Sequence, residues 1–190
     1  MKTMKNYLLP FMMLGILLLA VGCANSEERD NSSNSSEGSE NESAENSQES
    51  QENIQTVLEN IFTGPNEEQE KMLESNEDMA ENLTEFREEK FKPYVTDDFY
   101  ENDIVKLSGG VRFLLAAHPN YMLEVGEVTL DENEDKEGEY DFKVKVTFTN
   151  QEDEQSETMT VEGTASTNEE GKVKDIRYIN DEEFRDALGE

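Results

Sequence analysis

The spacing of apolar residues changes its period near residue 120, and this change divides the folded part of the chain into two kinds of element. Before that point apolar residues recur every three or four positions, as on one face of an α-helix. The first such stripe contains Ile54, Val57, Leu58, Ile61 and Phe62. Glycine and proline end helices, so we expect this helix to stop at Thr63-Gly64-Pro65.

Two further helices are predicted from residues that cap helix N-termini. Asn66 with Gln69 three positions later has the spacing of a capping box and predicts a helix toward Lys92, with a kink or break at Ser75-Asn76. The apolar seam of this helix contains Met72, Met79, Leu83 and Phe86. Thr96 has the position of the cap of a third helix. The buried face of that third helix is expected to contain Tyr100, Ile104 and Leu107.

The run VRFLLAAH, residues 111–118, is apolar on all sides and ends at Pro119. Such a run fits either a buried helix or a buried strand, because periodicity cannot separate the two. Leu114 to Ala117 are good helix formers, and this favours a helix.

From Tyr121 onward apolar and polar residues alternate, which is typical of β-strands with one buried face. A phase shift at Gly126-Glu127 predicts a β-bulge in the first strand. The clearest strand has an inward face of Tyr140, Phe142, Val144, Val146 and Phe148. Two more strands follow around 159–165 and 173–179, and residues 181–188 read as a short closing helix. The prediction is an α+β fold, with N-terminal helices packed on a curved antiparallel sheet of about four strands.

The order and lengths of these elements over residues 53–180 resemble the nuclear-transport-factor-2-like or cystatin-like α+β roll. The segment GKVKDIRYIN, residues 171–180, resembles the last strand of such domains. The resemblance implies a sheet that wraps the helices into a cone-like roll. It also implies that the mouth of the cone can hold a ligand, a peptide or an active site.

The first 22 residues have the pattern of an export signal. Residues 1–6 carry two lysines and no acidic residue, and the 16 residues of Tyr7–Gly22 carry no charge. A helix of this length spans about 24 Å, less than the ~30 Å hydrocarbon core of a bilayer. The pattern therefore predicts a secretory signal peptide over residues 1–22.

The end of this signal, Leu19-Ala20-Val21-Gly22-Cys23, resembles the lipobox of bacterial lipoproteins, with Ala20 where leucine is commonest. The resemblance implies cleavage between Gly22 and Cys23 and a diacylglyceryl-cysteine anchor, of the palmitate-bearing lipoprotein kind, on Cys23. Two acyl chains hold a protein stably on a membrane where one does not. The expected location is the outer face of the cell membrane of a Gram-positive bacterium. A non-lipidated signal and an uncleaved anchor are the alternatives.

Residues 24–52 contain nine acidic residues and one arginine, and no aromatic residue, branched aliphatic residue or methionine. Such a segment cannot bury enough apolar surface to offset the loss of chain entropy. We therefore predict a lipid-anchored, acidic, disordered tether over 23–52 and a folded domain over 53–190.

His118 is the only histidine. It lies directly before Pro119, and we expect a structural role in which its imidazole has hydrogen-bond partners within the fold. In the alternative, the domain is a small ketosteroid-isomerase-like enzyme with His118 as its acid or base; a pocket holding His118 beside an aspartate or tyrosine would favour it. The chain has no G-x-S-x-G motif and no glycine-rich phosphate loop. No catalytic residue and no cofactor-binding residue is predicted.

The acidic segment Asp131-x-Asn133-x-Asp135 has the start of a calcium loop but not its continuation. An EF-hand needs glycine at its sixth position and glutamate at its twelfth, where this chain has Lys136 and Phe142. We expect a solvated hairpin loop there, and we predict no metal site.

The net charge of −30, from 46 acidic and 16 basic residues, argues against nucleic acid as a partner. The expected partners are the membrane, through the lipid on Cys23, and an envelope protein, a peptide or a small hydrophobic ligand in the mouth of the cone. The predicted function is that of an extracytoplasmic lipoprotein with a non-catalytic binding domain. The alternatives are the His118 enzyme and a structural envelope spacer.

Overall fold

The computed structural model of the protein describes residues 39–75 and 78–189. The predictions for the signal peptide, the lipobox and Cys23 concern residues outside these ranges. The helices are α1 (Ser39–Ile61), α2 (Glu67–Glu74), α3 (Met79–Lys90), α4 (Asp97–Phe99), the π-helix η1 (Tyr100–Lys106), α5 (Arg112–Ala117) and α6 (Asp181–Ala187). The strands are β1 (Tyr121–Glu132), β2 (Glu139–Asn150), β3 (Ser156–Thr167) and β4 (Val173–Tyr178).

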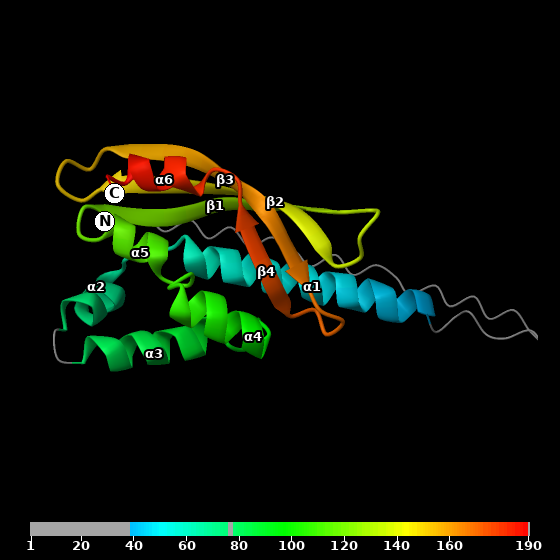
Figure 1. The fold of residues 1–190 in the computed structure, drawn as a ribbon. Coiled ribbons are helices and arrows are strands. Elements are labelled where there is room, and N and C mark those ends of the chain that lie inside the picture. Colours follow the sequence, from blue (N-terminus) through cyan, green and yellow to red (C-terminus); the bar gives the residue numbers. More distant parts are fainter. Residues whose placement is uncertain (1–38, 76–77, 190) are drawn as a thin grey trace, which may run out of the picture. The chain divides into compact units, whose positions relative to one another are not determined.

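The four strands form one antiparallel sheet in the order β1-β2-β3-β4. Its register shifts between Val125 and Glu127, as the phase change in the sequence predicts. Helices α1 to α5 and η1 precede a curved sheet that does not close on itself, and α6 follows it, so the predicted α+β class is confirmed. In Figure 1, α1 lies between the sheet and the layer formed by α2, α3 and α4.

The core lies between the inner face of the sheet and the apolar stripe of α1. All five predicted stripe residues, Ile54 to Phe62, are buried, and so are the inward-facing residues of β2 from Tyr140 to Phe148. An aromatic cluster joins the helices to the sheet: the Phe62 ring stacks on Phe113 of α5 with centroids 4.7 Å apart and meets Tyr178 of β4 edge-on at 6.1 Å. Burial of these large side chains supplies the main stabilisation of the domain.

The predicted local signals at the helix ends are mostly present. The Asn66 side chain accepts from the backbone of Glu68 and Gln69, and Gln69 returns the bond to Asn66, which completes the capping box. The long helix is broken after α2, as predicted, and residues 111–118 contain the helix α5 rather than a strand.

Leu107 differs from its prediction, because 72% of its surface is exposed. The backbone from Tyr100 winds as a π-helix, in which the Leu107 amide donates to the carbonyl of Asn102, five residues earlier. The 3.6-residue period that predicted a buried Leu107 does not hold in such a helix.

The predicted disordered tether extends too far along the chain. Helix α1 begins at Ser39, so residues 39–52 are helical, whereas the prediction placed them in the tether. The reason is that polar side chains fix this part of α1: Asn53 donates to the carbonyl of Gly171 at 3.1 Å, and the Ser50 hydroxyl lies 3.0 Å from that of Thr167. Hydrogen bonds at buried positions thus replace the apolar contacts on which the prediction depended.

Candidate binding site

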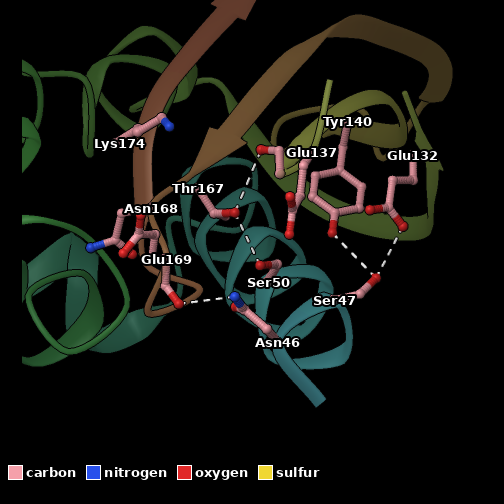
Figure 2. A pocket seen from close by; sticks show the side chains of 11 residues that line it. Asn46, Ser47, Ser50, Glu132, Glu137, Tyr140, Thr167, Asn168, Glu169 and Lys174 are labelled. Carbon is pink, nitrogen blue, oxygen red and sulfur yellow. Dashed lines mark hydrogen bonds between the residues drawn. The ribbon is translucent and has the colours of Figure 1, made fainter. Parts of the chain in front are cut away.

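A cleft of about 360 Å³ lies between the first half of α1 and the nearby ends of the sheet strands (Figure 2). This volume is within the ~300–1,000 Å³ of typical small-ligand pockets. Its sheet side is formed by the strand ends and connections of β1–β2 and β3–β4. It is lined by Asn46, Ser47, Ser50, Glu132, Glu137, Gly138, Tyr140, Thr167, Asn168, Glu169 and Lys174.

The wall formed by α1 is held to the strands by side-chain hydrogen bonds. The Ser47 hydroxyl donates to a carboxylate oxygen of Glu132 at 3.0 Å and lies 3.4 Å from the hydroxyl of Tyr140. The Asn46 amide nitrogen donates to the backbone carbonyl of Glu169 at 2.9 Å. Glu132 ends β1, Tyr140 lies at the start of β2, and Glu169 lies in the β3–β4 connection, so α1 is held on both sides of the cleft.

Tight turns bring these connections close to α1. Gly171 has a φ of +71°, and a side chain there would come within 3.1–3.3 Å of Glu49 and of the Ser50 backbone. Gly138, also at φ +71°, lies against Thr167 in the same way. Glycine is required at both positions because other residues rarely adopt this backbone conformation.

The polar groups that the cleft leaves available are mostly hydrogen-bond acceptors. Carboxylates of Glu132, Glu137 and Glu169 line it, and Lys174 is its single basic residue. Figure 2 shows Lys174 on the side away from Glu132 and Tyr140. Three carboxylates against one lysine make the lining acidic, and this favours a ligand that donates hydrogen bonds and carries positive charge.

A second, smaller cavity of about 110 Å³ lies between η1 and β4. At one wall the Arg112 guanidinium packs 4.5 Å from the ring centres of both Phe113 and Tyr178 and forms a 2.7 Å ion pair with Asp181. Burial raises the pKa of the Tyr178 phenol well above its ordinary value, an effect that Arg112 opposes. The phenol is therefore neutral at physiological pH and can donate a hydrogen bond.

Asp103 lines the same cavity from η1. Burial raises the pKa of its carboxyl group, and the nearby carboxylates of Asp175 and Asp98 raise it further. A carboxyl group and a phenol from distant parts of the chain thus share one small cavity. Its volume is well below that of pockets that enclose a whole ligand.

A third hollow, of about 390 Å³, lies along α2 and α3. Met72 and Phe86 contribute its apolar part, while Glu68, Glu85 and Lys71 are among its charged residues. Charges of both signs line this hollow, so it shows no clear preference for the charge of a ligand.

His118 lies at the C-terminal end of α5 and lines none of these three hollows. Its backbone N–H donates to the carbonyl of Leu114 at 3.1 Å. Its Nδ1 atom is buried and has no hydrogen-bond partner within the described part of the chain, so the imidazole is not satisfied as we expected. The tyrosine and the aspartate that share a cavity are Tyr178 and Asp103, and neither lies there beside His118.

The acidic segment from Asp131 to Asp135 crosses the end of β1 and forms a turn in which the Asn133 side chain accepts from the Asp135 amide at 3.0 Å. Within residues 39–75 and 78–189, no group of three or more histidine, cysteine or acidic residues is placed to hold a metal ion. No helix in these ranges is long and apolar enough to span a membrane.

The cleft residues were not predicted from the sequence. Asn46, Ser47 and Ser50 lie in the segment predicted to be disordered, and the opposite wall comes from charged turns that were interpreted as solvated. The one signal that could have found them is the pair of glycines, Gly138 and Gly171, which mark tight turns at the same end of the sheet.

No family model matches the chain, and no curated protein matches it. Among solved structures, the chain is similar to the NMR solution structure of TraH, named as a transfer protein of the Gram-positive conjugative plasmid pIP501. The two are 12% identical, the match covers 70% of this chain and 92% of that one, and the TM-score is 0.43. A likeness of this size assigns neither a family nor a function to the chain.

Proposed function

We propose that the protein is an extracytoplasmic lipoprotein, anchored through Cys23 to the outer face of the cell membrane of a Gram-positive bacterium, whose domain is a non-catalytic binding module. Its ligand binds in the cleft between α1 and the nearby strand ends and carries a cationic, hydrogen-bond-donating group, such as the lysine or arginine side chain of a peptide. The observation that carries the binding proposal is the acceptor-rich lining of this cleft.

Support for the anchor comes from the sequence. The basic start, the uncharged run Tyr7–Gly22 and the small residue before Cys23 together fit a lipoprotein signal. The remaining chain is strongly acidic and would be repelled by anionic headgroups, so a covalent lipid is the plausible means of attachment.

Support for a cationic ligand comes from the side chains of the cleft. Three carboxylates and a single lysine line the cleft. Charge-assisted hydrogen bonds from an ammonium or guanidinium group would satisfy these acceptors. A small hydrophobic molecule would leave them unpaired, so the lining favours a basic peptide over such a ligand.

Replacement of the cysteine tests the anchor. In cells that express Cys23→Ala, we expect the protein to leave the membrane fraction, whereas wild type stays in it. The intact mass of purified wild type should show cleavage before Cys23 and an added diacylglyceryl group. Retention of Cys23→Ala in membranes would instead indicate an uncleaved anchor.

Charge removal in the cleft tests the ligand class. The probe is the fluorescent peptide acetyl-Gly-Arg-Gly-Lys-Gly-amide, and its affinity for the full chain is measured by anisotropy in a non-ionic detergent. We expect Glu132→Gln/Glu137→Gln to weaken binding about tenfold. The matched control, Glu152→Gln/Glu154→Gln, removes the same charge from the exposed β2–β3 turn and should change affinity less than about twofold. Equal weakening by both variants would show attraction to the acidic surface as a whole and would contradict the proposed site.

A further inference from the structure

The cavity between η1 and β4 has features of a peptide-docking site that is separate from the cleft. Its apolar walls come from Ile61, Ile104 and Ile176, and Leu107 stands at its rim with 72% of its surface exposed. A single exposed apolar side chain is ordinary, but Leu107 adjoins the apolar walls of this cavity, so the two together form one continuous apolar surface. The π-helix that places Leu107 there is itself an uncommon structure that often occurs at functional sites.

The edge of the sheet beside this cavity is open along most of β4. Within the described part of the chain, β4 pairs with β3 on one side, and on its other side only Val173 is paired. There Val173 donates to the carbonyl of Tyr94 at 3.0 Å and accepts from the amide of Thr96 at 2.9 Å, in the parallel direction. The edge from Asp175 to Tyr178 is therefore free to accept an added strand, which extended peptides readily supply.

The side chains of this edge lead into the cavity. Ile176 and Tyr178 are two positions apart, so they point to the same face of the strand, and both line the cavity. A peptide strand laid along the edge would direct every second side chain to this face. A cavity of 110 Å³ suits one aliphatic side chain rather than a whole ligand.

The acidic residues around the cavity indicate which charge the partner peptide carries beside its aliphatic side chain. Asp98, Asp103 and Asp175 lie close enough together to raise the pKa of Asp103. Arg112 already forms an ion pair with Asp181. Asp175 forms an ion pair with Arg177, but the Arg177 side chain is mostly exposed, so this pair contributes little free energy. Basic residues in a partner would relieve the repulsion among these three carboxylates.

We propose that the β4 edge from Asp175 to Tyr178, together with this cavity, binds an extended peptide segment in which one aliphatic side chain is flanked by lysine or arginine. The aliphatic side chain enters the cavity against Leu107, and the backbone of the peptide adds a strand to the sheet. The flanking basic groups lie near Asp103 and Asp175.

The test uses the full chain in a non-ionic detergent and the fluorescent peptide acetyl-Lys-Val-Leu-Val-Lys-amide, with affinity measured by anisotropy. We expect Leu107→Ser to weaken binding about tenfold, because it removes the apolar contact with the leucine of the peptide. Ile179→Ser is the matched control, because Ile179 is equally exposed at 73% but does not line the cavity. It should change affinity less than about twofold. Both residues are largely exposed, so neither change should unfold the domain.

Three altered peptides complete the test. Serine in place of the central leucine, glutamate in place of both lysines, and N-methylation of backbone amides should each reduce binding about tenfold, because they remove the anchor, the charge and the strand pairing. In a chain that already carries Glu132→Gln/Glu137→Gln, which removes charge from the cleft, Leu107→Ser should still weaken binding of the unaltered peptide about tenfold, and this separates the two sites. Equal losses in Leu107→Ser and Ile179→Ser, or full affinity of the N-methylated peptide, would overturn the proposal.

Discussion

At the scale of single residues, Asp103 makes the stability of the domain depend on pH. Burial and two neighbouring carboxylates raise the pKa of Asp103 in the folded state, so its ionised form is disfavoured there relative to the unfolded chain. The resulting loss of stability is fully present above the folded-state pKa of Asp103. It disappears as the pH falls below the unfolded value of about 3.9.

We therefore expect Asp103→Asn to raise the free energy of unfolding at pH 7. The gain should shrink toward zero as the pH approaches about 3, where Asp103 is protonated in both states. Urea unfolding of wild type and variant at a series of pH values measures this difference. A gain that does not change with pH would show that the amide stabilises the fold by its shape or hydrogen bonds instead.

Residue-level predictions from the sequence succeeded where the signal was local. The capping box depends only on Asn66, Gln69 and their backbone, and the bulge at Gly126 follows from the alternation on either side of it. The cavity shared by Asp103 and Tyr178 could not be predicted, because the two residues lie far apart in the sequence and only the folded chain brings them together.

At the scale of elements, the main difference between prediction and structure is the start of α1. Apolar periodicity locates a helix that packs through apolar contacts, and it found residues 54–62 for that reason. The preceding part of α1 packs through Ser50, Asn53 and their partners on the β3–β4 connection, and polar residues of this kind also compose disordered segments. The sequence pattern therefore cannot distinguish the two cases.

The contact between α1 and the β3–β4 turn predicts the effect of a methyl group at Gly171. An alanine Cβ would lie 3.2 Å from the Ser50 backbone nitrogen, which cannot move without shifting α1, and it would have an unfavourable φ of +71°. Gly189→Ala is the control, because its φ is +88° but nothing lies within 4 Å of the added atom. We expect Gly171→Ala to lower the free energy of unfolding by about 1 kcal/mol more than the control does in urea titrations. Equal losses would mean that the contact with α1 is not tight.

At the scale of the whole molecule, the element order over the domain was enough to predict the α+β class and the four-stranded antiparallel sheet. That success is expected, because alternation and helical periodicity report which face of each element is buried. The sites depend instead on polar groups at turns and helix ends, where position is determined by the tertiary fold. Sequence patterns therefore predicted the core of this protein much better than its surface.

The same surface makes the stability of the molecule depend on salt. With 46 acidic and 16 basic residues, repulsions outnumber attractions, and surface pairs such as Lys143–Glu162 offset little of the imbalance. Salt shortens the screening length from about 10 Å at 0.1 M to about 3 Å at 1 M. We therefore expect the Tm of the full chain, followed by circular dichroism in a non-ionic detergent, to rise between about 0.01 and 0.5 M NaCl by several degrees and then level off. A continued linear rise would indicate exclusion of salt from the protein surface, and a fall would show that the ion pairs dominate.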